Sequence, residues 1–324
     1  MTSEREPPYP ETPGILTFLG VPEGDVEHLR EGMVAVAGVS YDLSCAGLVG
    51  ARFAPRAYRE TSQYYAGAFS RGEMVEIITG DRMKRPGRLR ILDLGDLNAY
   101  PLDWPRTEAA LREAMGEIAR RGALPVILGG DHLVTGPLVQ GFADAVRERT
   151  GRPIGYVQFS SQLDLGERDP VWGTVWRGTT ARRILDSQAV DARHMAWIGT
   201  NGYLRLDDWE FAEKHGLTVF TLEDVRRQGI VEVVENAVEV AGNGCAAIYV
   251  SVDFDVLDGG YVAMQGTPRF EGLTNVELLR AMDVLRRTKA GALDLVGLNP
   301  TVTMVSVTGQ RFGVWLVIRF LAGS

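Results

Sequence analysis

Four short polar segments directly follow apolar runs in the sequence, and they hold acidic and histidine side chains. They are DLGD (93–96), GGDH (129–132), SSQLD (160–164) and DFD (253–255). One such segment alone is more often turn or capping chemistry than a site. Ligands of parallel α/β sheets, however, bind at the carboxyl ends of the strands. Four strand ends of this kind therefore predict one shared site, with carboxylates and an imidazole suited to proton transfer or to a hard cation.

The elements that would position these segments alternate between strands and helices. Apolar runs predict strands at 33–39, 89–95, 124–130, 154–160, 194–200, 217–222 and 246–256, with a further candidate at 294–300. Apolar side chains at three- and four-residue spacing predict helices at 105–122, 134–151, 231–244 and 275–288. The apolar segment 312–323 is expected to be a packed helix or strand. Continuous apolar strands between helices predict a mostly parallel sheet covered on both faces.

Composition narrows the class of protein. The 324 residues predict one domain at 15–324 after a flexible arm at 1–14 that is rich in Pro and Glu. A net charge of −8 argues against nucleic acid or an anionic membrane as partner. The two cysteines, Cys45 and Cys245, fit a reducing compartment and form no thiolate cluster. With neither a signal peptide nor an apolar span in the sequence, we expect a cytoplasmic protein.

Longer motifs occur in an order that resembles the ureohydrolase superfamily of arginases and agmatinases, from residue 31 onward. They are GARFAPRAYRET (50–61), ILDLGD (91–96), GGDH (129–132), SVDFDVLD (251–258) and GTPRFEGLTNVEL (266–278). The resemblance implies a three-layer α-β-α sandwich around a parallel sheet of about eight strands, in a homo-oligomer that is a trimer or hexamer. It also implies hydrolysis of a guanidino or amidino C–N bond by two Mn²⁺ ions that activate a shared water.

The metal ligands that this resemblance implies are incomplete. The family's DAHxD motif corresponds to Ser160-Ser161-Gln162-Leu163-Asp164, so Ser160 replaces the bridging Asp and Gln162 replaces a His. The ligands that remain are His132, Asp164, Asp253 and Asp255. A hydroxyl and an amide bind Mn²⁺ less well than a carboxylate and an imidazole. We therefore expect no metal, or at most one weakly bound Mn²⁺.

Three more positions bear on the ligand. Arg177 stands where the family has the His of a His-Gly pair, and Gly297 where it usually has Glu. Glu277 is the acid to which the resemblance assigns a contact with a substrate guanidinium. We predict that Arg177 pairs with the retained acids in place of the metal charge; the alternative is that it points to solvent from a loop. A fixed cation would also favour a carboxylate-bearing ligand.

These residues support three functions. The leading hypothesis is a repurposed, metal-independent enzyme that acts on a small nitrogenous molecule, amino-acid-like or guanidino/amidino. Its catalytic residues would be Asp164, Asp253, His132, Glu277 and Arg177, and its substrate-binding residues Ser160, Gln162, Glu277 and Arg177. A second hypothesis is a non-catalytic pseudoenzyme or regulatory subunit, possible in a mixed oligomer with a homologous chain. A third is a metal-dependent C–N hydrolase with an atypical mononuclear site.

Overall fold

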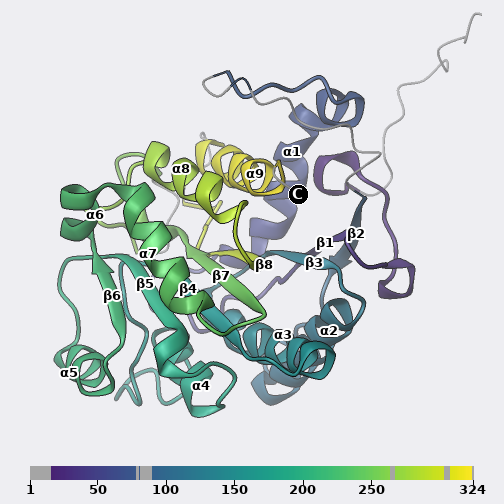
Figure 1. Ribbon diagram of the computed structural model, residues 1–324. Coiled ribbons are helices and arrows are strands. Elements are labelled where there is room, and N and C mark those ends of the chain that lie inside the picture. Colours follow the sequence, from purple (N-terminus) through teal and green to yellow (C-terminus); the bar gives the residue numbers. More distant parts are fainter. Residues whose placement is uncertain (1–15, 78–79, 81–89, 263–266, 303–306, 323–324) are drawn as a thin grey trace, which may run out of the picture.

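The computed structural model describes residues 16–77, 80, 90–262, 267–302 and 307–322 (Figure 1). The predicted arm at 1–14 lies outside these residues. Eight strands form one sheet, and all pairings between them are parallel, as the sequence predicts. The strands are β1 (Val34–Gly38), β2 (Ile91–Asp96), β3 (Leu124–Leu128), β4 (Ile154–Phe159), β5 (Met195–Thr200), β6 (Thr218–Thr221), β7 (Ala247–Asp253) and β8 (Ala290–Val296).

Nine α-helices lie in the described part of the chain. They are α1 (Ala54–Arg71), α2 (Trp104–Arg120), α3 (Thr135–Thr150), α4 (Thr180–Asp186), α5 (Leu206–His215), α6 (Leu222–Gln228), α7 (Ile230–Gly242), α8 (Asn275–Leu285) and α9 (Thr308–Leu321). The apolar C-terminal segment is thus a helix, α9. The last strand, β8, begins four residues before the predicted start and ends before Gly297, whose φ of 78° leaves the strand conformation.

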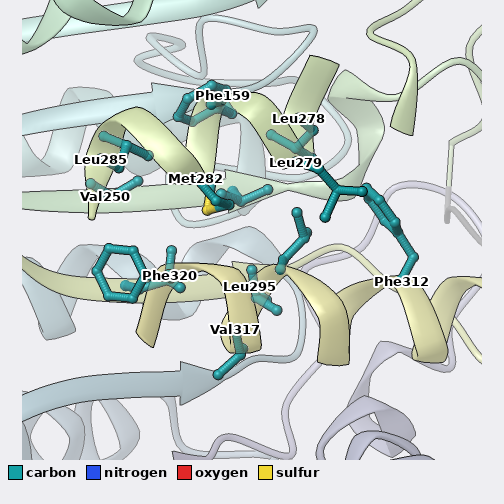
Figure 2. Close-up of a cluster of buried hydrophobic side chains, with 14 of the residues drawn as sticks. Phe159, Val250, Leu278, Leu279, Met282, Leu285, Leu295, Phe312, Val317 and Phe320 are labelled. Carbon is teal, nitrogen blue, oxygen red and sulfur yellow. The ribbon is translucent and has the colours of Figure 1, made fainter. Parts of the chain in front are cut away.

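Two apolar cores hold the helices against the two faces of the sheet. One core packs α1, α6, α7, α8 and α9 on one face, and the other packs α2, α3, α4 and α5 on the opposite face (Figure 1). Side chains that alternate along each strand supply both cores: Val157 of β4 points into the first, and Tyr156 into the second. Figure 2 shows part of the first core, where Leu295 of β8 lies among side chains of α8 and α9. The three-layer α-β-α sandwich is confirmed.

The order of the strands decides which loops meet. The sheet runs β2-β1-β3-β8-β7-β4-β5-β6, so β3, β8, β7 and β4 are neighbours at its centre. Parallel strands place their carboxyl ends on one edge, and the loops after these four strands therefore lie together. No helix in the described residues is both long and apolar enough to cross a bilayer.

Candidate functional site

Three of the four predicted polar segments come together at the carboxyl ends of the central strands. His132 starts a short 3₁₀ turn after β3, and Asp164 lies in the loop after β4. Asp253 is the last residue of β7, and Asp255 lies in the 3₁₀ turn that follows. All four side chains are buried. The neighbouring positions of β3, β7 and β4 around β8 explain why segments so far apart in sequence meet.

The DLGD segment does not line this site, so the expectation that four segments converge is wrong for it. It ends β2, which is an edge strand separated from β3 by β1. Arg59 of α1 forms ion pairs with Asp93 at 2.9 Å and with Asp96 at 2.5 Å. These acids attach α1 to the sheet edge, which is a structural role.

His132 lies between two of the retained acids. Its Nδ1 is 3.0 Å from Asp164 Oδ2 and 3.2 Å from Asp253 Oδ2, and the residue is 1% exposed. Neither contact meets hydrogen-bond geometry, and Nδ1 has no hydrogen-bond partner among the described residues. On the other side of the ring, Nε2 lies 3.2 Å from Ser251 Oγ. Burial opposes a charged imidazole, but contacts with Asp164 and Asp253 outweigh it and raise the pKa of His132 well above its ordinary value.

Asp164 is held in an unusual backbone conformation. Its φ is 53°, in the left-handed region that Asp tolerates better than most residues. Gln158 Nε2 donates to Asp164 Oδ2 at 2.9 Å, and the Tyr156 hydroxyl donates to Gln158 Oε1 at 2.9 Å. Backbone strain of this kind persists where the surroundings fix a side chain for function. The Tyr156–Gln158 chain therefore fixes the carboxylate that faces His132.

Asp255 accepts three hydrogen bonds from the segment that replaces DAHxD. Ser160 Oγ donates to Oδ1 at 3.0 Å, Ser161 N donates to Oδ1 at 2.9 Å, and Ser161 Oγ donates to Oδ2 at 2.9 Å. Arg269 Nε in turn donates to Ser161 Oγ at 2.9 Å. Burial, and then the charges of Asp253 and Asp164, raise the pKa of Asp255 to about 6.

Asp253 stays ionised despite its burial. Desolvation alone would raise its pKa, but His132 and the nearby charge of Arg177 outweigh desolvation and hold the pKa of this carboxyl below its ordinary value. Asp255 N also donates to Asp253 Oδ1 at 2.9 Å. In the DFD segment, Asp253 is therefore kept as a carboxylate, whereas Asp255 titrates close to neutral pH.

A small cavity of about 10 Å³ adjoins these groups, which is room for roughly one water molecule. His132, Asp253, Asp255 and Arg177 line it. Arg177 is half-buried; its Nη2 donates to Thr267 Oγ1 at 3.2 Å, and its Nε is buried without a hydrogen-bond partner among the described residues. Burial disfavours its charge, but Asp253, Asp255 and Asp164 outweigh burial and raise its pKa.

Arg177 thus points inward and not to solvent, but it makes no direct ion pair. No carboxylate oxygen of a described residue lies within 4.0 Å of its guanidinium nitrogens, in contrast with the predicted pairing. The retained acids already have closer partners, namely His132 for Asp253 and the two serines for Asp255. The charge of Arg177 therefore acts on Asp253 and Asp255 by electrostatic attraction across the cavity, without direct contact.

Four predicted site residues do not line the cavity: Asp164 and Ser160, which contact the residues around it, and Glu277 and Gln162, which point elsewhere. Glu277, at the first turn of α8, accepts hydrogen bonds from Thr274 N and Oγ1 and forms an ion pair of 2.5 Å with Arg226. Gln162 turns back onto its own loop, where Nε2 donates to the Ser161 carbonyl at 3.2 Å. Neither side chain belongs to the cavity wall.

Sequence reasoning missed several residues of the site. Asp131 and Cys45 line the cavity, and Arg269 supports Ser161. Asp131 could have been recognised from the sequence, because it belongs to the GGDH segment. Burial raises the pKa of Asp131 to about 6, although hydrogen bonds from Ser44 and Leu133 oppose this rise. Arg269 also lies in a quoted motif. Cys45 lies in a loop with no motif that would single it out.

The donor groups do not fit the two manganese ions that the sequence resemblance implies. Ser160, at the position of the bridging Asp, offers a neutral hydroxyl that donates to Asp255 Oδ1. Gln162, at the position of a metal-binding His, faces its own backbone. No group of three or more His, Cys, Asp or Glu side chains in the described part of the chain is arranged to hold a metal ion. His132, Asp164 and Asp253 come nearest, as a cluster of ion-pair contacts.

Comparisons with known proteins agree with this architecture. A model of the Arginase family matches residues 33–322. The formimidoylglutamase of Halalkalibacterium halodurans is 28% identical over 280 residues, which cover 85% of this chain and 82% of the relative. The guanidinopropionase of Pseudomonas aeruginosa is 29% identical over 293 residues, which cover 90% of this chain and 86% of the relative.

Solved structures show the same fold. The proclavaminate amidino hydrolase from Streptomyces clavuligerus superimposes with a TM-score of 0.80 at 26% identity, covering 98% of this chain and 100% of that one. The formimidoylglutamase from Bacillus subtilis reaches a TM-score of 0.79 at 21% identity, covering 93% and 92% of the two chains. With the family matched across nearly the whole chain and the fold shared, this protein belongs to the Arginase family.

Proposed function

We propose that this arginase-family protein cleaves a C–N bond of a small nitrogenous carboxylate without the two-manganese centre. The observation that carries the proposal is the environment of Asp255, whose oxygens accept three hydrogen bonds from Ser160 and Ser161. Of these two donor residues, Ser160 stands where the resemblance implies a metal ligand. The charges that remain, His132 and Arg177 against Asp164 and Asp253, are arranged for proton transfer.

The roles follow from the charges of the groups. His132 carries a proton at neutral pH and is the general acid, which gives that proton to the departing nitrogen. Asp253 is ionised and accepts a proton from the attacking water. The water oxygen then bonds to the amidino carbon as the C–N bond breaks, and the amine leaves with the proton from His132. Arg177 offsets negative charge that develops beside the cavity.

The substrate class is supported by the names of two relatives and by the cation in the cavity. Formimidoylglutamase and guanidinopropionase are named for substrates that carry a carboxylate. Arg177 in the cavity wall favours such a substrate over a simple cation such as agmatine.

Turnover by metal-stripped protein tests this proposal. The chelator-treated protein would be incubated with formimidoylglutamate, guanidinopropionate and agmatine, and amine or urea release would be followed. We expect release from a carboxylate-bearing compound that chelator does not reduce and that His132→Gln abolishes. Release that requires added Mn²⁺ would refute the proposal.

A non-catalytic role is the second candidate, and one observation favours it. The cavity of about 10 Å³ admits one water-sized group, so any larger ligand has to widen it. In this case the protein would act as a subunit of a mixed oligomer with a catalytically active homologue. Purification from its native cell, followed by mass spectrometry of co-purifying chains, would reveal such a partner in constant ratio.

A further inference from the structure

The acids around the cavity already have partners within the protein. Ser44 and Leu133 donate to Asp131. The other two acids are engaged as well, Asp253 with His132 and with Asp255 N, and Asp255 with the serines. A guanidinium ligand would therefore compete with these partners for the carboxylates.

No further acid is available to bind a cation at Gly297 or Glu277: the first has no side chain, and the second is already paired. Gly297 lies in the cavity wall, and a Cβ atom at this position would lie 2.2 Å from Asp253 Oδ1. Since its φ is 78°, a side chain would be strained as well as crowded. Glu277, the other candidate acid, is held at the start of α8 by Thr274 and Arg226.

The unsatisfied hydrogen-bonding groups of Arg177 at the cavity are donors. A guanidinium carries five N–H groups, and Arg177 uses one of them on Thr267. Its buried Nε has no hydrogen-bond partner in the described part of the chain. A donor left unsatisfied in a buried place costs free energy, which a ligand oxygen would recover. The cavity is thus built to receive one acceptor atom.

We propose that Arg177 binds a carboxylate oxygen of the ligand, and that the nitrogen to be cleaved lies on the same carbon as that carboxylate. His132, Asp253 and Arg177 line the same small cavity, so a carboxylate at Arg177 and a reacting nitrogen at His132 must be close neighbours in the ligand, and the cavity has to widen to admit both. The rest of the ligand would lie toward Leu48, a cavity-lining residue that is 61% exposed. The ligand class is an N-amidino or N-formimidoyl α-amino acid. The second half of this inference rests on the proposed function.

Binding of acetate and of guanidinium by metal-stripped protein tests the role of Arg177. Both would be titrated at constant ionic strength, with the thermal unfolding midpoint and the fluorescence of the neighbouring Trp176 as readouts. We expect saturable binding of acetate and none of guanidinium, and an acetate affinity at least about tenfold weaker in Arg177→Gln, because a charge-assisted hydrogen bond is lost. Arg193→Gln is the matched control, since Arg193 is 75% exposed and pairs with Asp191 on the surface.

Arg177→Lys keeps the inference testable if the Gln variant does not fold. It retains the positive charge but loses the planar donor fork, and acetate binding should weaken. Saturable guanidinium binding by the wild type, or undiminished acetate binding by either variant, would overturn the role of Arg177. These measurements use unreactive probes, so their result is independent of whether the protein turns over a substrate.

The position of the nitrogen is tested by competition against acetate. Guanidinoacetate, with its nitrogen on the carbon next to the carboxylate, should displace acetate at lower concentration than guanidinobutyrate does. The reverse order would refute the α arrangement while leaving the carboxylate contact of Arg177 in place.

Discussion

The Ser161 hydroxyl donates a hydrogen bond of 2.9 Å to Asp255 Oδ2 and accepts one of 2.9 Å from Arg269 Nε. The half-buried Arg269 is thereby linked to a buried acid through one hydroxyl group. In the proposed account this chain of contacts, together with Ser160, stabilises Asp255 without a metal ion.

Removal of the Ser161 hydroxyl should destabilise the protein. In Ser161→Ala, Asp255 loses one buried donor and Arg269 loses its acceptor, which should lower the free energy of unfolding by about 1–3 kcal/mol. Urea unfolding measures the change. Ser70→Ala is the control, because Ser70 is an exposed residue of α1 whose hydroxyl contacts only the Gly67 carbonyl. Equal losses in the two variants would argue against a structural role for the Ser161 contacts.

Restoration of the DAHxD motif should restore metal binding. The triple variant Ser160→Asp, Ser161→Ala, Gln162→His replaces two hydrogen-bond donors near Asp255 and adds a carboxylate and an imidazole. After dialysis against Mn²⁺ and removal of the free ion, it should retain more manganese per chain than the wild type. Equal manganese in the two proteins would show that the segment at 160–164 does not control metal binding.

The stability of the protein should depend on pH through Asp208, a buried acid of α5. Burial, and then the charge of Asp164, raise the pKa of Asp208 from 3.8 to about 7. Between these values the unfolded chain releases the proton while the folded state keeps it, so the free energy of unfolding falls as pH rises. Asp208→Asn removes this dependence and should exceed the wild type in stability by a few kcal/mol above neutral pH.

Urea unfolding of both proteins at about pH 5 and about pH 8 measures this difference. The advantage of the variant should grow from the lower pH to the higher one. A constant difference between the two proteins would mean that Asp208 ionises normally in the folded state.

The core between β8 and the helices α8 and α9 should be sensitive to truncation. Leu295 is fully buried there, so Leu295→Ala should lower the free energy of unfolding by about 2–5 kcal/mol (Figure 2). Leu102→Ala is the control, because Leu102 is 98% exposed and its loss should change stability by less than about 0.5 kcal/mol. Chemical denaturation compares the two variants, and a loss at Leu295 no larger than at Leu102 would contradict the assigned packing.

The fold was predictable from sequence because its strands are continuous apolar runs and its motifs are long. Helices α1, α4, α5 and α6 were not predicted. Polar residues are spread through α1 and α5, as at the exposed Glu210 of α5, and α4 and α6 have only seven residues each. The cluster of His132, Asp164, Asp253 and Asp255 was predicted from strand ends together with the family resemblance, because the strand ends alone also included the acids of DLGD.

The partners of these residues were not predictable, because they depend on side-chain directions across loops. The sequence contains Ser160 and Ser161 but does not reveal that their hydroxyls donate to Asp255. It likewise contains Glu277 without showing that Arg226 of a neighbouring helix holds it. The DLGD segment was wrongly assigned to the site for a related reason: its acids form ion pairs with Arg59, which the sequence does not show.

The decisive experiment is the manganese content of the purified wild-type chain, expressed with Mn²⁺ supplied and purified without chelator. We expect well under one ion per chain, because Asp255 is held by Ser160 and Ser161 and Gln162 faces its own loop. Two tightly held ions per chain would contradict this expectation and would make metal-dependent hydrolysis of a guanidino or amidino compound the leading function.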